Sequence, residues 1–141
     1  MANLLDPLTL AHGPAMKNRL ALAPLTNLQS HPDGRMSEDE FNWLTYRAKG
    51  GFALTMTCAA HVQRIGQGFP GQMGIFGDEH LEGLTRLAAE IRKNQSIAVV
   101  QLHHAGMRSP KDRIGEAPVA PSDDEATGAR GLSMAEVEQV I

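Results

Sequence analysis

At 141 residues, the chain is long enough for one ordinary domain, and its 42% hydrophobic and 21% charged residues are typical of a globular protein. A formal net charge of −3 with scattered Lys and Arg argues against nucleic acid as a partner, and the apolar runs are too short to span a membrane. The single cysteine excludes an intrachain disulfide, and the chain opens without the basic and apolar regions of a secretion signal, so we expect a cytoplasmic protein.

The first part of the chain predicts a strand, a helix and a second strand. Residues 18–23 (NRLALA) form an apolar run that ends at Pro24, which cannot donate to a sheet ladder. After a polar loop, Ser37 and Glu40 have the spacing of a capping box, and the helix that follows ends at a pair of glycines. The second strand, residues 52–57 (FALTMT), is so uniformly apolar that we expect cover on both faces.

The second part repeats this order. A long glycine-rich connection leads to a helix that begins near Asp78 and carries apolar residues at helical spacing. Residues 96–101 (SIAVVQ) are the third predicted strand, and another long loop leads to a last helix with capping-box spacing at Ser133 and Glu136. Strand, loop and helix thus follow one another three times, which predicts parallel βα units of an α/β fold.

The long loops all leave from the C-terminal ends of the predicted strands, and right-handed crossovers bring these ends to the same side of a sheet. The three ends carry Ala23-Pro24-Leu25-Thr26, Cys58-Ala59-Ala60 and Gln101-Leu102-His103-His104. Small residues, a hydroxyl, an amide and imidazoles suit a flat heterocycle with carbonyl and NH edges. The residues alone leave two interpretations open, a cofactor-binding face and a set of polar groups that face water.

Five stretches of the chain form a recognisable set: APLT at 23–26, YRAKGG at 46–51, GQGFPG at 66–71, GIFGDEH at 74–80 and QLHHAG at 101–106. Together they resemble the Old Yellow Enzyme family of NADH:flavin oxidoreductases. The resemblance implies FMN bound at the C-terminal end of a TIM barrel. It also implies reduction of activated C=C bonds with NAD(P)H as electron donor. Residues 1–141 would be the first three βα units of this (β/α)8 barrel, an N-terminal portion of an FMN-binding domain that the chain does not complete.

The resemblance also assigns residues to the flavin. These residues are Ala23, Pro24, Leu25, Thr26, Ala59 and Gln101. The first four would lie along the ring, with the Thr26 hydroxyl near the C4 carbonyl and N5, where a hydrogen bond tunes the reduction potential. Ala59 would offer backbone groups to the flavin edge, and the Gln101 amide would bond the pyrimidine side.

Each of these residues has a structural alternative. Thr26 could cap a strand end, and Ala59 could be small because packing demands it. We expect Cys58 to be a buried small hydrophobe, since no helix N-terminus or basic partner flanks it. His103 and His104 are adjacent on an extended segment and point in opposite directions, so no metal site is predicted, and His104 is expected to support its loop.

Three hypotheses follow for the whole chain. The first is the N-terminal part of a flavin-dependent ene-reductase that acts on a small activated alkene. Residues that hold the substrate carbonyl, donate the proton and bind the flavin phosphate belong to later segments of that family and have no counterpart here. The second is a truncated, inactive structural or oligomerising module, since an unclosed sheet exposes an edge that invites another copy or a complementary chain. The third is a different phosphate- or cofactor-binding barrel enzyme.

Overall fold

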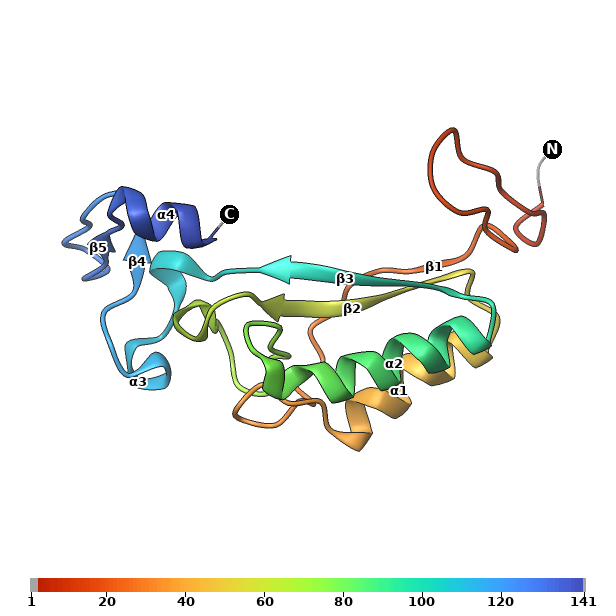
Figure 1. Ribbon diagram of the computed structural model, residues 1–141, viewed down its shortest axis with the longest axis horizontal. Coiled ribbons are helices and arrows are strands. Elements are labelled where there is room, and N and C mark those ends of the chain that lie inside the picture. The colour runs from red at the N-terminus through yellow and green to blue at the C-terminus, as the bar shows by residue number, and fades with distance from the viewer. Residues whose placement is uncertain (1–2, 141) are drawn as a thin grey trace.

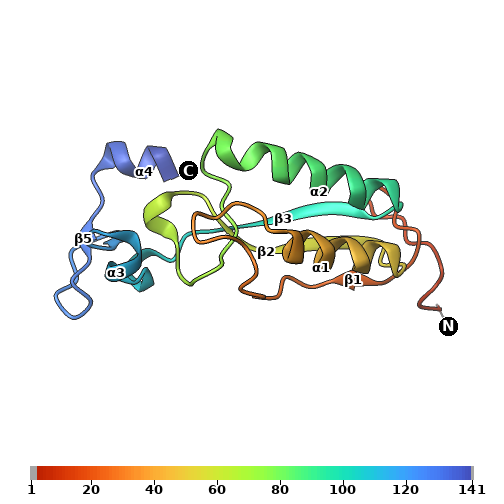
Figure 2. The ribbon, with the colours of Figure 1, turned by 90° about the horizontal axis from the view of Figure 1, so that it is seen from below.

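The computed structural model describes residues 3–140 (Figure 1). Its central sheet is parallel and has the order β1-β2-β3, with β1 at Ala21–Leu22, β2 at Leu54–His61 and β3 at Ile97–His103. Helices α1 (Glu38–Lys49) and α2 (Leu81–Lys93) connect the strands and lie side by side on one face of the sheet (Figures 1 and 2). The predicted succession of parallel βα units is therefore confirmed.

The strand boundaries differ from the predicted ones. The first strand covers only two of the six predicted residues. Just before it, the Asn18 side chain bonds the backbone of Leu20 and Gly51, and the Leu20 carbonyl accepts from the Ala53 N–H at 3.0 Å. Strand β2 begins two residues later than predicted and continues to His61, and β3 continues to His103. The extensions add residues 58–61 to β2 and residues 102–103 to β3, so that both strands end at a histidine.

The first helix has only half of the expected capping box. Ser37 Oγ accepts a hydrogen bond from the Glu40 backbone N–H at 3.1 Å, which satisfies one free donor of the helix end. The Glu40 carboxylate, however, turns toward the protein interior, where it is fully buried. Helix α1 ends at Gly50 as predicted.

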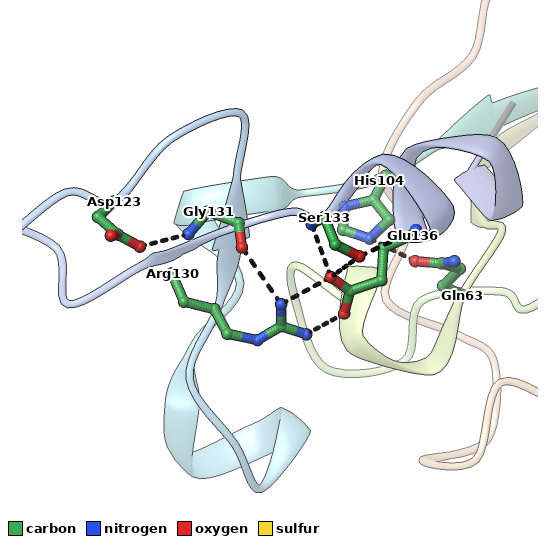
Figure 3. Close-up of polar contacts among 7 residues, drawn as sticks. All are labelled: Gln63, His104, Asp123, Arg130, Gly131, Ser133 and Glu136. Atoms are coloured by element: carbon green, nitrogen blue, oxygen red, sulfur yellow. Dashed lines mark hydrogen bonds and ion pairs between the residues drawn. The ribbon is translucent and has the colours of Figure 1, made fainter.

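The last helix, α4 (Met134–Val140), has the complete motif. Ser133 Oγ accepts from the Glu136 N–H at 3.3 Å, and the Glu136 carboxylate accepts from the Ser133 N–H at 2.8 Å (Figure 3). The same carboxylate pairs with Arg130, and the two side chains share hydrogen bonds of 2.6 and 3.1 Å. The Arg130 guanidinium and the Ser133 hydrogen bonds lower the pKa of Glu136 to about 2.

Short elements in the long loops have no periodic signal in the sequence. They are α3 (Lys111–Ile114), β4 (Val119–Ala120), β5 (Arg130–Gly131) and the 3₁₀ turns η1 (Arg64–Gly66), η2 (Asp78–His80) and η3 (Gly106–Arg108). Strands β4 and β5 pair in parallel as a second small sheet, near the C-terminal end of β3 (Figure 1). Turn η2 leads directly into α2, so the helical segment begins at Asp78, as the sequence predicted.

The core lies between the sheet and the two long helices. Its buried members are Phe41, Leu44, Ala48, Cys58, Ala60, Met73, Leu87 and Ile91. Phe41 and Leu44 of helix α1 lie in this cluster, and Trp43 packs against it while partly exposed. None of the helices within residues 3–140 is long and apolar enough to cross a membrane.

The opposite face of the sheet is less well covered. The register pairs Leu54 with Ile97 and Met56 with Val99, and all four side chains are only partly buried. The expectation that the second strand is covered on both faces is therefore wrong for this half of β2 within the described part of the chain. In a closed barrel this face would line the interior.

Candidate cofactor site

The C-terminal ends of the three parallel strands lie along the same border of the sheet, which we call the C-terminal edge. Ala59 and Gln101 are register partners on β2 and β3, so two of the predicted site residues are neighbours. Leu22 pairs with Thr55, and Thr26 and Ala59 each follow these partners by four positions. The parallel sheet therefore brings the Thr26 segment to the same edge.

A bulge in β2 determines which side chains at this edge face the helices and which face the opposite side of the sheet. The register between β2 and β3 shifts between Met56 and Ala59, where Thr57 Oγ1 accepts a hydrogen bond of 3.2 Å from the Gln101 N–H. An extra residue reverses the alternation of side chains along a strand. Because of it, Cys58 and Ala60 face the helices while Ala59 and Gln101 face the other side.

The predicted site residues differ in exposure. Ala59 is buried, at 9% of its full exposure, while the side chain of its neighbour Gln101 is exposed. On the first strand end, Leu25 and Thr26 are exposed and Pro24 is partly buried; Ala23 is also exposed. A planar amide with two donors and one acceptor thus stands beside a small residue at an open edge, which fits a flat ring that has carbonyl and NH groups.

A buried glutamine that the sequence did not single out organises the second strand end. Gln72 has no exposed surface, and its Nε2 donates to the carbonyl of Ala59 at 3.1 Å and to His103 Nδ1 at 3.0 Å. Its Oε1 accepts from the Gly68 N–H at 2.7 Å. The Ala59 carbonyl is therefore already occupied, and the glycine-rich loop is fixed over the end of β3. No local pattern reveals this role, because Ala59 and His103, the two partners on the strands, lie 13 and 31 positions away.

The two histidines have different partners. His103 accepts from Gln72, whereas His104 bonds Gln63 Oε1 through Nε2 at 3.2 Å (Figure 3). His104 Nδ1 also accepts from the Gly106 N–H at 2.9 Å. Burial lowers the pKa of His104, which favours the neutral ring in this arrangement. The expectation that His104 supports its loop is confirmed.

The cysteine at this edge is a buried thiol. Cys58 has 1% of its surface exposed and donates from Sγ to Glu40 Oε1 at 3.1 Å. Burial, followed by the charge of Glu40 and this hydrogen bond, raises the pKa of Cys58 to about 12. The thiol therefore stays protonated at neutral pH, as expected for a packing residue and not for a nucleophile.

Parallel βα units with polar residues at the C-terminal ends of their strands are the building units of β/α barrels, a class whose ligand sites lie at that end. Residues 3–141 match the profile of the NADH:flavin oxidoreductase / NADH oxidase family. The chain belongs to this family.

Individual relatives agree with this assignment. The chain is 37% identical to a probable NADH-dependent flavin oxidoreductase, YqiG, of Bacillus subtilis, and the match covers 98% of this chain and 38% of that protein. It is 36% identical to NADH:fumarate oxidoreductase of Klebsiella pneumoniae, with 98% of this chain and 16% of that protein covered. It is 32% identical to NADH:acrylate oxidoreductase of Vibrio harveyi, with 100% and 14% covered.

Solved structures show the same fold. An old yellow enzyme homologue from Zymomonas mobilis superposes with a TM-score of 0.83 at 26% identity, over 98% of this chain and 42% of that one. A 2-naphthoyl-CoA reductase complex superposes with a TM-score of 0.86 at 25% identity, over 97% and 23%. The chain thus spans less than half of each of these proteins and corresponds to the N-terminal part of their barrels.

Proposed function

We propose that this chain forms the N-terminal, flavin-facing part of an FMN-dependent oxidoreductase that reduces activated C=C bonds with NAD(P)H as electron donor. The observation that carries the proposal is the pairing of exposed Gln101 with Ala59 at the edge that also holds Thr26. The chain that carries these residues belongs to the NADH:flavin oxidoreductase / NADH oxidase family, which supports a flavin as the ligand. Bound FMN would supply hydride transfer, which no side chain of the protein can perform.

The residues at the edge suit three tasks toward such a ring. The Gln101 amide offers donors and an acceptor in one plane, as the pyrimidine part of a flavin requires. The Thr26 hydroxyl would hydrogen-bond the ring and tune its potential, with Ala23, Pro24 and Leu25 along the ring. Ala59 leaves room for a close approach of the ring, because its side chain is a single methyl group.

The substrate class is an alkene next to an electron-withdrawing group. Two relatives are named for acrylate and fumarate, which are both unsaturated carboxylates. These names describe those proteins, and they support activated alkenes as the first compounds to test here. A free cysteine and NAD(P)H as electron donor both fit a reducing compartment, so we propose the cytoplasm as the location of the protein.

The face of the sheet opposite the helices has partly exposed apolar side chains, which further protein would cover. Residues 1–141 would act as one portion of a barrel domain, and further βα units would cover Leu54, Met56, Ile97 and Val99 and pair with the free edge of β3. The same face supports the second candidate, an inactive module that buries it against another copy.

One experiment separates the two candidates. The chain is purified alone and after co-expression with the remaining βα units of the Bacillus relative, and flavin absorbance and oxidation of NADH or NADPH with fumarate, acrylate and cyclohexenone are measured. We expect the complemented protein to carry nearly equimolar FMN and to turn over at least one alkene. A complex that stays colourless in excess FMN would refute the flavin proposal, and a defined homo-oligomer of the chain alone would favour the module.

A further inference from the structure

A carboxylate lies fully buried beneath the loop that follows β1. Glu40, in the first turn of α1, has no exposed surface, and its carboxylate accepts three side-chain hydrogen bonds. Asn27 Nδ2 donates at 3.2 Å, Cys58 Sγ donates at 3.1 Å, and Ser30 Oγ is the third donor. A buried carboxylate is costly unless it is fully partnered, and all three partners present donors to it.

The partners are next to the proposed flavin residues in the chain. Asn27 directly follows Thr26, and Cys58 directly precedes Ala59. One carboxylate therefore ties the end of the first strand to the end of the second.

The loop itself is bent into an unfavourable conformation. Leu28 has a φ of 57°, in the left-handed region that side chains other than those of glycine and asparagine rarely adopt. It lies between Asn27 and Ser30, so the two residues that flank the strained turn bond the same carboxylate. Gly71 packs directly against the Leu28 backbone, and its carbonyl accepts from the Ser30 N–H at 3.0 Å.

We propose that Glu40 is a positioning residue for the cofactor edge. It holds the strained loop 27–30 against β2 and thereby orients Thr26 relative to Ala59. The inference rests on the proposed function in one respect, namely that Thr26 faces the flavin. The loop-holding role itself requires no cofactor, so the two can be tested separately.

The first test measures backbone amide hydrogen exchange of residues 25–30 in the chain alone. In this segment the Gln29 N–H donates to Asn27 Oδ1 and the Ser30 N–H donates to the Gly71 carbonyl. Glu40→Gln places an amide where three donors need an acceptor, and we expect exchange in this segment to become about 10-fold faster. Cys58→Ser keeps a donor toward Glu40 and should stay close to the wild type. The matched control is Thr55→Val, which breaks the buried 2.9 Å hydrogen bond between Thr55 and Ser96 at the other end of the sheet.

The second test measures FMN binding in the complemented protein. With Glu40→Gln, we expect the dissociation constant for FMN to rise about 10-fold and the flavin midpoint potential to fall, since Thr26 no longer donates well to the reduced ring. Thr55→Val should leave both values unchanged. If the complemented wild type binds no flavin, the proposed function is refuted, and the hydrogen-exchange result still tests whether Glu40 holds the loop.

Two outcomes overturn the inference. One is unchanged exchange of residues 25–30 in Glu40→Gln, or an equal increase in Thr55→Val. The other is a loosened loop with unchanged FMN affinity and potential, which would show that the loop does not orient the flavin edge. If Glu40→Gln fails to fold, Asn27→Ala removes one of the three donors and is judged by the same measurements.

Discussion

Replacing Gln72 by leucine tests how the second strand end is held. The substitution keeps nearly the same volume and leaves three groups without their partner: the Gly68 N–H, the Ala59 carbonyl and His103 Nδ1. A lost hydrogen bond of this kind costs about 1 kcal/mol, and more where the group stays buried. Gly68 and His103 are partly exposed and regain water, whereas Ala59 is buried. We expect Gln72→Leu to lower the free energy of unfolding by about 2 to 3 kcal/mol.

A glutamine of the same loop provides the control. Gln67 is also buried, at 7% exposure, but it makes a single long hydrogen bond of 3.4 Å to the carbonyl of Pro32. Gln67→Leu should therefore cost about 1 kcal/mol or less. Urea unfolding of both variants, followed by far-ultraviolet circular dichroism, gives the comparison. Equal losses in the two variants would refute the role assigned to Gln72.

Two further predictions concern backbone strain and pH. Gly71→Ala would place a Cβ 2.4 Å from the Leu28 carbonyl oxygen, at a φ of +64°, so it should lower the free energy of unfolding by more than about 2 kcal/mol. The control is Gly115→Ala, whose Cβ meets nothing within 4 Å at a φ of +80° and should cost about 1 kcal/mol. A smaller loss at Gly71 than at Gly115 would contradict the close approach. Burial is the main cause that lowers the pKa of three histidines, His61, His80 and His104. A lowered folded-state pKa means that the unfolded chain binds protons first, so stability should be constant above about pH 7 and fall as the pH drops below about 6.5, the unfolded value. Thermal unfolding between pH 8 and 5 checks this, and a flat profile would contradict it.

Helices α1, α2 and α4 were predictable because their signals are local. Ser37 and Ser133 each mark a helix start through bonds to residues three positions away, and glycine ends α1 one residue after Lys49. The identity of the three strands was predictable for the same reason, since each is a short apolar run. Their ends were not, because β2 and β3 extend as far as cross-strand bonds continue.

The residues that organise the site were harder to predict because their partners are distant in sequence. Glu40 has the spacing of a capping box, yet its carboxylate bonds Asn27, Ser30 and Cys58 across 13, 10 and 18 positions. Thr57 reverses the alternation of β2 through one bond to β3, so spacing along the strand alone would place Ala59 on the wrong face. The resemblance to flavoenzymes assigned Ala59 and Gln101 without showing how either is held.

Under the proposed function, barrel closure and FMN binding would be coupled, because the residues proposed to contact the flavin lie at the open C-terminal edge of the sheet. Gln101 and Thr26 are exposed, and the interior side chains Met56 and Val99 beneath them are only partly buried. Hydrogen bonds to a flavin at such an edge compete with water and gain little strength from a low dielectric. Covering the interior face with further βα units would remove this water and bury the apolar side chains together. Because a ligand that binds only the closed form stabilises that form, FMN should strengthen the association of this chain with its complement in proportion to how much more tightly the closed form binds it.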